Sequence, residues 1–302
     1  MMESPFAFGE RLVIGTAGLA GLWGPVDPAE SLRTLLLAFE AGILHVDTAP
    51  AYAHAQPLVG KALKEWTGPR PSVSTKAGKK RSDSPDIAIL DYSPEGIRTS
   101  VEESLQLLGV EVIDLLFLHD PVAMKPEEYE PAITEMTSLQ QRGLVRSLGM
   151  GGQFADDFWG HASSGLFSHF MGFNRYNAIR QEANGYVYPK IKEAGMRIWQ
   201  ASPLYMGLLG NKYHQYLTTR PEWIPDADFA AAQALHARCA SSGCSMTGVA
   251  LNYVFRSASI DRMVLGASRP EELQATLDWL TDEQHISLAD ILIHDHLSPY
   301  QG

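Results

Sequence analysis

The chain has 302 residues, a length that a β/α barrel fills as one unit, and 45% of them are hydrophobic, enough for a large buried core. Its 24 basic and 35 acidic residues give a net charge of −11 without a long basic run, which argues against nucleic acid or an anionic membrane surface as a partner. No apolar stretch approaches the roughly 20 residues that cross a bilayer, no signal peptide is evident and the two cysteines suit a reducing compartment, so we expect a cytoplasmic protein.

Short apolar runs alternate along the chain with longer amphipathic segments. The runs that are predicted to be strands cover residues 12–16, 44–48, 72–75, 112–118, 147–150, 169–174, 196–200 and 263–265. The segments that are predicted to be helices cover residues 27–42, 56–66, 93–108, 127–142, 154–164, 186–194, 229–242, 246–256 and 270–280. The first helix shows the signals used, with Asp27 as its N-cap, Pro28 at its first position and Gly42 at its end.

The eight cycles of strand and helix follow one another without a long linker. They predict one α/β domain over residues 1–302 that folds as a (β/α)8 TIM barrel. An open doubly wound sheet is the alternative, but no GxGxxG turn follows any predicted strand. The longest irregular stretches, residues 79–94 and 210–228, both follow strand ends, so we expect them on the rim where barrel enzymes carry their chemistry.

Four polar residues lie at or just after the ends of three successive predicted strands. Asp47 and Tyr52 belong to DTAPAY after the second strand, Lys76 to STKAG after the third, and His119 to FLHDP after the fourth. A parallel barrel brings these strand ends to one rim, so the four side chains are predicted to be neighbours. A tyrosine hydroxyl has a pKa of about 10, and a nearby ammonium lowers it. Lys76 is predicted to lower the pKa of Tyr52, with Asp47 holding Lys76 charged and His119 contacting a substrate oxygen.

Each of these residues also has an ordinary structural explanation. Asp47 alone is explained as a turn residue, Tyr52 as a packed loop aromatic, Lys76 as a solvent-facing side chain and His119 as a satisfied buried group. Their joint placement favours proton transfer at an oxygen whose carbon gains or loses hydride. Because barrels also place lysine nucleophiles at strand ends, a Schiff-base lyase that uses Lys76 is an alternative class of enzyme.

The chain also resembles a known family. It is similar to the aldo-keto reductases, β/α barrels that transfer hydride between nicotinamide cofactors and carbonyls or alcohols, in the segments GTAGLAGLWG, VDTAPAY, VSTKAG, VIDLLFLHDP, GLVRSLGMGG, QASPLYMGLL and LGASRPEEL. The likeness covers nearly the whole chain. The order and spacing of the aspartate, tyrosine, lysine and histidine are specific to that family.

The resemblance implies a role for each residue of the site. It makes Tyr52 the general acid/base, Asp47 and Lys76 its tuning pair, and His119 the group that orients the substrate. Trp23, after the first strand, matches an aromatic residue of the substrate pocket. The implied cofactor contacts are Gly151, Gly152, Ser202, Pro203, Leu204, Gly266, Ala267, Ser268, Arg269, Glu272 and Thr276. Residues 266–268 also lead into a helix N-terminus, where backbone N–H groups face an anion.

Three departures from the family pattern bear on the cofactor. Many members hold the nicotinamide carboxamide with Ser-Asn after the fifth strand, where this chain has Gly151 and Gly152, so another group must hold that amide. A tyrosine that stacks on the nicotinamide in many members is replaced by Ala201. At Glu272, members that prefer NADP commonly carry an arginine, whereas a carboxylate repels the 2′-phosphate. Arg269 argues for NADP, because its guanidinium can reach the phosphate. Taken together, these residues favour NAD as the cofactor, with NADP as the alternative.

These departures, together with the PEWIP segment, make the chain similar to the sugar 1-dehydrogenase branch of the family. That branch includes L-galactose, L-fucose and D-threo-aldose dehydrogenases and related pyridoxal dehydrogenases. The resemblance therefore implies NAD-linked oxidation of an aldose, or of a similar hemiacetal, at the anomeric hydroxyl to give a lactone. An NADPH-dependent aldehyde or ketone reductase and a cofactor-binding regulatory subunit are the alternatives. The expected partner is a small-molecule sugar or aldehyde, while the particular sugar and the oligomeric state stay open.

No metal site is expected in this chain. Cys239 and Cys244 lie five positions apart without a histidine or cysteine partner at zinc-finger spacing. The C-terminal residues His285, His294 and His296 are interpreted as isolated surface histidines rather than metal ligands.

Overall fold

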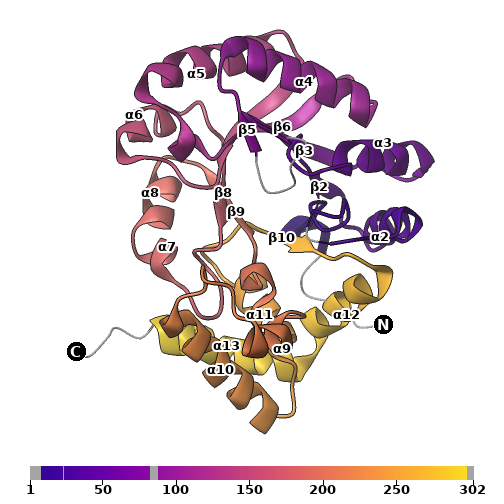
Figure 1. Ribbon diagram of the computed structural model, residues 1–302, viewed down its shortest axis with the longest axis vertical. Coiled ribbons are helices and arrows are strands. Elements are labelled where there is room, and N and C mark those ends of the chain that lie inside the picture. Colours follow the sequence, from indigo (N-terminus) through magenta and orange to yellow (C-terminus); the bar gives the residue numbers. More distant parts are fainter. Residues whose placement is uncertain (1–7, 23, 82–87, 298–302) are drawn as a thin grey trace.

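Eight parallel strands close into a barrel in the computed structural model, which describes residues 8–22, 24–81 and 88–297 (Figure 1). The strands of the barrel are β1 (Leu12–Gly15), β2 (His45–Asp47), β3 (Ser72–Ala77), β6 (Ile113–His119), β7 (Val145–Gly151), β8 (His169–Phe173), β9 (Arg197–Ala201) and β10 (Arg262–Gly266). They follow one another around the barrel in chain order, and β10 closes the ring by pairing with β1. The predicted (β/α)8 fold is confirmed.

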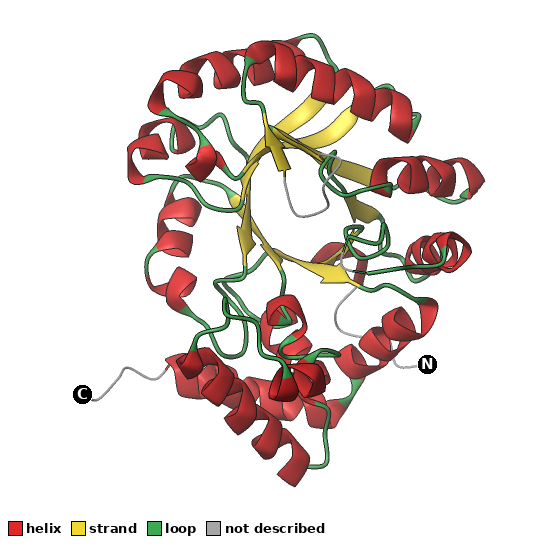
Figure 2. Ribbon diagram, viewed as in Figure 1, coloured by secondary structure: helices red, strands yellow, loops and turns green. Residues whose placement is uncertain are grey.

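Helices surround the barrel on its outside (Figure 2). Those between successive barrel strands are α2 (Pro28–Glu40), α3 (Ala55–Glu65), α4 (Pro94–Leu108), α5 (Pro126–Gln141), α6 (Trp159–Ala162), α7 (Glu182–Gly185), α8 (Val187–Glu193), α9 (Tyr213–Thr218), α10 (Asp226–Ser241) and α11 (Met246–Phe255). Before β1 lies α1 (Phe8–Arg11), and after β10 lie α12 (Pro270–Thr281) and α13 (Glu283–Leu297). Among the described residues, no helix combines the length and the apolar character that a bilayer crossing requires.

Local capping explains where the barrel helices begin and end. The Asp27 carboxylate accepts a hydrogen bond from the Ala29 N–H at 2.8 Å, and the Ser93 hydroxyl oxygen accepts one from the Gly96 N–H at 3.0 Å. These side chains satisfy N–H groups that have no partner inside the first helical turn. Gly109 ends α4 with φ of 65°, a left-handed conformation that glycine adopts without a Cβ clash.

Several elements differ from the prediction. The irregular stretch after β3 contains an antiparallel hairpin of β4 (Lys79–Arg81) and β5 (Ala88–Leu90), and the stretch after β9 contains α9. The helix predicted at 270–280 is not the last one, because α13 follows α12 after a single residue, Asp282. The helix predicted at 154–164 is reduced to the 3-10 turn η2 (Asp156–Phe158) and α6, while the helix predicted at 186–194 is present as α8 and is preceded by the unpredicted short helix α7.

The barrel interior is filled by side chains that alternate with those facing the helices. On β6, Leu115 and Phe117 point into the barrel, whereas Leu116 and Leu118 join the core between the sheet and the helices. The interior cluster consists of Val13, Leu115, Phe117, Met171, Trp199 and Val264. Phe117 and Trp199 meet edge to face with ring centroids 5.6 Å apart. The side chains of this interior cluster fill the centre of the barrel.

Two histidines pack beside Trp199 at the amino ends of their strands. His45 begins β2 and His169 begins β8, and their ring centroids lie 6.3 and 5.5 Å from that of Trp199. Burial, together with neighbouring arginines, lowers the pKa of each histidine to about 4. Both imidazoles are therefore neutral in the folded protein at pH 7, at the rim opposite the carboxyl ends.

We predict that these two histidines make the fold sensitive to acid. Because the folded pKa of about 4 lies below the unfolded value of 6.5, the unfolded chain takes up protons first as the pH falls, and the stability present above pH 6.5 is lost down to pH 4. Each histidine contributes less than about 1.4 kcal/mol per pH unit, since both rings keep some contact with solvent. Urea unfolding between pH 7 and 4 should therefore show a shallower loss of stability in His45→Gln and His169→Gln.

The matched control is His294→Gln, at an exposed position on α13. It should follow the wild-type curve. Equal acid sensitivity in all three variants and the wild type would contradict this assignment.

Candidate active site

Backbone strain gathers at the rim formed by the carboxyl ends of the strands. In residues 8–22, 24–81 and 88–297, six non-glycine residues have positive φ, between 47° and 58°. They are Ala53, Asp120, Asn174, Ser202, Tyr205 and Met206, and all of them follow the ends of β2, β6, β8 or β9. Such a conformation costs roughly 1–3 kcal/mol and persists only where the surrounding structure enforces it. The strain marks this rim as the candidate site.

A buried ion pair joins the ends of β2 and β3. The Lys76 Nζ lies 2.6 Å from Asp47 Oδ2, and both side chains are 3% exposed. Lys76 also donates to the Thr48 carbonyl oxygen at 3.0 Å, and the Ser74 hydroxyl donates to Asp47 Oδ1 at 2.8 Å. Asp47 and Ser74 are partners in the register of the two strands, which places the carboxylate beside the lysine. The pair is therefore both buried and hydrogen-bonded, as a stable buried ion pair has to be.

The charge of Lys76 is maintained by its neighbours. Burial alone lowers the pKa of this lysine, but Asp47 and Tyr52 more than compensate, so its pKa is raised above 10.5. The side chain therefore carries a full positive charge at neutral pH. A cation in an environment with little water acts strongly on the groups next to it.

Tyr52 lies against this cation in the loop between β2 and α3. The Lys76 Nζ is 4.7 Å from the centroid of the Tyr52 ring. Burial raises the pKa of the Tyr52 hydroxyl above 10, the Asp47 carboxylate adds to this, and the opposing effect of Lys76 does not outweigh them. Lys76 thus lowers the pKa of Tyr52, as the sequence predicted, but burial has the larger effect and the net pKa is raised. The Tyr52 hydroxyl is therefore a neutral phenol at pH 7.

His119 completes the group at the end of β6. Its ring meets that of Tyr52 edge to face, with centroids 6.2 Å apart and planes at 89°. Burial and the nearby Lys76 and Lys79 ammonium groups hold the pKa of His119 well below 6.5, so the imidazole is neutral. The buried Nδ1 has no hydrogen-bond partner in the described part of the chain. The structure thus brings together all four residues that the sequence predicted as neighbours.

Two further residues, which the sequence reasoning did not identify, stand beside His119. Asp120 follows it directly and forms an ion pair with Lys79 of the β4–β5 hairpin. The Tyr92 hydroxyl, just beyond that hairpin, donates to the carbonyl oxygens of His119 at 2.7 Å and of Asp120 at 3.0 Å. The signal in the sequence was the aspartate in FLHDP, which resembled an ordinary turn residue.

The two glycines after β7 make room for Asp120. The Asp120 N–H donates to the Gly151 carbonyl oxygen at 2.7 Å. A Cβ built at Gly152, where φ is 92°, would lie 1.6 Å from Asp120 Oδ1. The carboxylate of Asp120 therefore occupies the space that a side chain at Gly152 would need.

The predicted cofactor residues occupy two further places on the rim. Ser202, Pro203 and Leu204 form the strained turn after β9, where the Ser202 hydroxyl oxygen accepts from the Met206 N–H at 3.1 Å. Trp23, the predicted pocket aromatic, lies outside the described residues.

The segment from Gly266 to Thr276 leads from β10 into α12 and already binds a carboxylate. Glu272 Oε2 accepts from the Ser268 N–H at 2.9 Å, and its Oε1 lies 3.2 Å from an Arg269 guanidinium nitrogen. Thr276 donates to the Glu272 carbonyl oxygen within α12, and Ala267 is buried. A Cβ built at Gly266 meets no atom within 4 Å, so the space above this glycine is open. The Ser268 N–H and the Arg269 guanidinium are thus donors for an anion, and the Glu272 carboxylate is that anion here.

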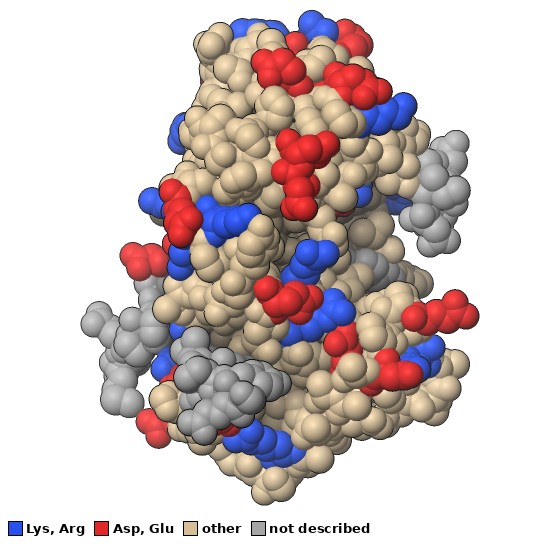
Figure 3. Space-filling model, turned by 90° about the vertical axis from the view of Figure 1, so that its left-hand side faces the viewer, with Lys and Arg blue, Asp and Glu red and all other residues tan. Residues whose placement is uncertain are grey.

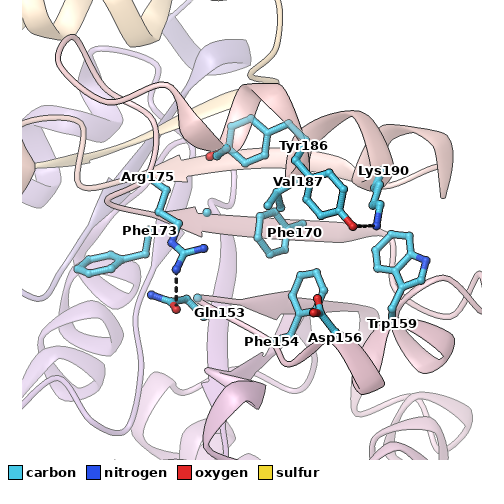
Figure 4. A pocket seen from close by; sticks show the side chains of 14 residues that line it. Gln153, Phe154, Asp156, Trp159, Phe170, Phe173, Arg175, Tyr186, Val187 and Lys190 are labelled. Atoms are coloured by element: carbon cyan, nitrogen blue, oxygen red, sulfur yellow. Dashed lines mark hydrogen bonds between the residues drawn. The ribbon is translucent and has the colours of Figure 1, made fainter.

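An aromatic groove of about 300 Å³ lies outside the barrel between α6 and α8 (Figure 4). Its polar side chains contact one another, because Arg175 donates to Gln153 at 3.0 Å and Lys190 donates to the Tyr186 hydroxyl (Figure 4). On this side of the molecule acidic and basic side chains are interspersed (Figure 3). The groove does not contain the residues of the ion pair or their neighbours at the ends of β2 and β3.

The interpretation of the C-terminal histidines needs one correction. His285 is buried rather than on the surface, because its Nδ1 lies 2.5 Å from Asp282 Oδ1 and its Nε2 accepts from the Ser245 N–H at 2.9 Å. His294 is exposed, and the side chain of His296 lies outside the described residues. Cys239 and Cys244 are free thiols. Within the described ranges, no group of histidine, cysteine, aspartate and glutamate side chains is suited to a metal ion.

Comparisons with known proteins identify a matching family, related sequences and a related fold. The sequence model of the Aldo/keto reductase family matches residues 11–293. L-galactose dehydrogenase of Arabidopsis thaliana is 27% identical over 284 residues, which cover 91% of this chain and 85% of the relative. D-threo-aldose 1-dehydrogenase of a Pseudomonas species is 27% identical over 290 residues, covering 88% and 87%. A solved structure of glycerol dehydrogenase from Gluconobacter oxydans shares the fold, with a TM-score of 0.75 at 23% identity over 95% of this chain and 92% of that one.

The ion pair predicts a distinct pattern of stability in variants. Lys76→Met leaves the Asp47 carboxylate buried without its cation and should cost about 3–5 kcal/mol of unfolding free energy. The double variant Asp47→Asn/Lys76→Met removes both charges and should cost clearly less than the sum of the two single changes. Urea unfolding measures all three values.

Arg33→Met is the control, because its ion pair with Glu30 leaves 64% of the arginine side chain exposed. This variant should change the stability by less than about 1 kcal/mol. A small effect of Lys76→Met, similar to that of Arg33→Met, would show that the buried pair does not have the strength argued here.

Proposed function

We propose that this chain, which belongs to the aldo/keto reductase family, oxidises an aldose or a similar cyclic hemiacetal at its anomeric hydroxyl with NAD as the hydride acceptor. The observation that carries the proposal is the contact of Tyr52 with the buried Lys76 and Asp47 pair, next to a neutral His119. A proton carrier, a fixed cation and an imidazole meet there at one point. Removal of hydride from a carbon that bears a hydroxyl needs a proton acceptor at that hydroxyl, and this combination supplies one.

Tyr52 is the general base in the proposed reaction. Its raised pKa means that the side chain begins as a phenol and must release its proton to solvent, with which Tyr52 keeps some contact, before it accepts the one from the anomeric hydroxyl. Lys76 stabilises the phenolate, because its ammonium lies 4.7 Å from the ring centroid. His119, as a neutral imidazole, forms a hydrogen bond with the same substrate oxygen and positions it. NAD supplies the acceptor for the hydride when it is bound. In the reverse direction the Tyr52 phenol donates its proton to a carbonyl oxygen.

The protonation state of Lys76 supports its role in stabilising the Tyr52 phenolate over the role of a Schiff-base nucleophile. A lysine that attacks a carbonyl must first be a neutral amine. Here its pKa is raised, and the ammonium is bonded to Asp47 Oδ2 and to the Thr48 carbonyl oxygen. These contacts keep the Lys76 side chain protonated, and a protonated amine has no lone pair with which to attack a carbonyl.

The relatives support the substrate class. Two of them carry names of enzymes that act on aldoses, L-galactose dehydrogenase and D-threo-aldose 1-dehydrogenase. Each aligns over at least 88% of this chain. This is the reason for placing an aldose ahead of a simple aldehyde or ketone.

The contacts of Glu272 support NAD over NADP. A 2′-phosphate would seek the Ser268 N–H and the Arg269 guanidinium, and the Glu272 carboxylate already binds both. Binding of NADP therefore requires displacement of one anion by another. NAD carries a ribose hydroxyl in that place, and a carboxylate is a good acceptor for it.

We predict that Glu272→Gln shifts the coenzyme preference towards NADP. The change frees Arg269 and removes the negative charge, so kcat/KM for NADP relative to NAD should rise by about tenfold or more, as expected for one charged hydrogen bond. Glu271→Gln is the control, since this exposed neighbour in the first turn of α12 makes no contact with Ser268. A wild-type preference for NADP, or no shift in Glu272→Gln, would argue against the assignment to NAD.

The proposed reaction is tested by following NADH and NADPH formation with a panel of sugars and pyridoxal. We expect NADH formation with at least one free aldose, and release of the lactone in equal amount. Turnover of simple aldehydes with NADPH, without oxidation of any aldose or of pyridoxal, would replace the proposal by the carbonyl reductase alternative.

Tyr52→Phe separates the chemistry from binding in the same assay. It retains the ring that covers Lys76 and removes only the hydroxyl, so the turnover should fall by at least about 100-fold. The affinity for NADH, measured by fluorescence titration, should stay within about threefold of the wild type, since the loss concerns the transition state. Undiminished turnover in Tyr52→Phe would refute the role of this residue.

A further inference from the structure

The carboxylate of Asp120 faces the same space as the imidazole of His119. Asp120 Oδ2 lies 4.0 Å from His119 Nε2, and the two side chains are 30% and 13% exposed. His119 is the residue that positions the reacting oxygen in the proposed function. A second polar group at this distance is close enough to meet an oxygen on the neighbouring carbon of the same substrate.

The position of Asp120 is enforced from several sides. Its backbone has φ of 50°, its N–H donates to Gly151 and its carbonyl oxygen accepts from Tyr92. Gly152 has no side chain that would displace the carboxylate. Backbone strain that the surroundings hold in place in this way is typical of functional residues, because it fixes a side chain before a ligand arrives.

Asp120 and Lys79 together present both an acceptor and a donor. Lys79 Nζ donates to Asp120 Oδ2, the oxygen that faces His119 Nε2, while Oδ1 lies beside Gly152. The ammonium has three N–H donors, of which one is used by this bond. Both side chains remain partly open, at 30% for Asp120 and 20% for Lys79.

A hydroxyl group is the substrate group that matches this pair. It donates to the carboxylate and accepts from the ammonium at the same time, whereas an alkyl group or hydrogen in that place satisfies neither. A site built to bond a hydroxyl rejects the analogue without it, because the polar groups of the site then stay unpaired. The pair is therefore suited to choosing between a sugar and a simple carbonyl compound.

We propose that Asp120 and Lys79 bind the hydroxyl on the carbon next to the reacting carbon and so restrict the enzyme to substrates that carry one, such as aldoses with a free 2-hydroxyl. This inference rests on the proposed function and adds to it the part of the substrate that is recognised. Lys79 begins β4 and Tyr92 follows β5, so both ends of the same hairpin contact Asp120 or His119.

The test compares L-galactose, L-fucose and D-arabinose with their 2-deoxy counterparts in the wild type and in variants. Asp120→Gly removes the carboxylate, and both glycine and the second variant, Asp120→Asn, tolerate the positive φ. We expect the ratio of kcat/KM between each sugar and its 2-deoxy form to fall at least about tenfold in Asp120→Gly and in Lys79→Met, with a smaller fall in Asp120→Asn. Lys80→Met is the matched control on the same hairpin, because Lys80 pairs with Glu103 instead. It should keep the wild-type ratio.

The outcomes separate this inference from the proposed function. If the wild type oxidises neither an aldose nor pyridoxal, the proposed function fails and this inference fails with it. If it oxidises pyridoxal but no aldose, only the inference is overturned, because the carbon next to the reacting carbon of pyridoxal carries no hydroxyl. If the wild type oxidises aldoses but Asp120→Gly loses activity equally with and without the 2-hydroxyl, only the inference is overturned. A change confined to the affinity for NADH, measured by fluorescence titration, overturns it as well, since Asp120 would then contact the coenzyme.

Discussion

The buried ion pair between Asp47 and Lys76 is the interaction on which the rest of the site depends. Two charges that leave water are tolerated only when their geometry is close and their other hydrogen bonds are met, and Ser74 and Thr48 provide those bonds. The fixed ammonium then acts on both neighbours. It opposes the effect of burial on the pKa of Tyr52, and it helps to keep His119 neutral. One charge thus influences the protonation of both Tyr52, the proposed general base, and His119, the residue proposed to position the substrate.

Much of the fold followed from local patterns in the sequence. Alternation of apolar strands and capped helices predicted the barrel, and the rule that parallel strands end on one rim brought Asp47, Tyr52, Lys76 and His119 together. The β4–β5 hairpin was missed because its strands are three residues long, and much of the segment is charged and contains Pro and Asp, which are typical of loops. The pKa of Tyr52 was also beyond pattern reasoning, because its direction depends on whether burial or the cation has the larger effect.

The side-chain contacts at the rim could not be predicted from residue types alone. The sequence marked Glu272 as a charge that repels a phosphate; the structure adds that this carboxylate already binds the N–H and the guanidinium that a phosphate would use. Similarly, Gly151 and Gly152 were recognised as a departure from the family pattern. The structural reason for a glycine at position 152 follows only from the position of Asp120, whose carboxylate fills the space that a side chain there would need. Both cases depend on contacts between segments far apart in the chain, which no local pattern contains.

The hairpin between β3 and α4 has a consequence for how such an enzyme diversifies. Lys79 of the hairpin and Tyr92 just beyond it contact Asp120 and His119, yet the paired strands of the hairpin form a separate two-stranded sheet and add no strand to the barrel. If Asp120 and Lys79 bind the substrate as proposed, mutations in the hairpin would alter which substrates are accepted while the barrel and its ion pair continue to fold as before. The hairpin would then be an exchangeable module, through which new specificities evolve without the loss of stability that accompanies changes in a packed core.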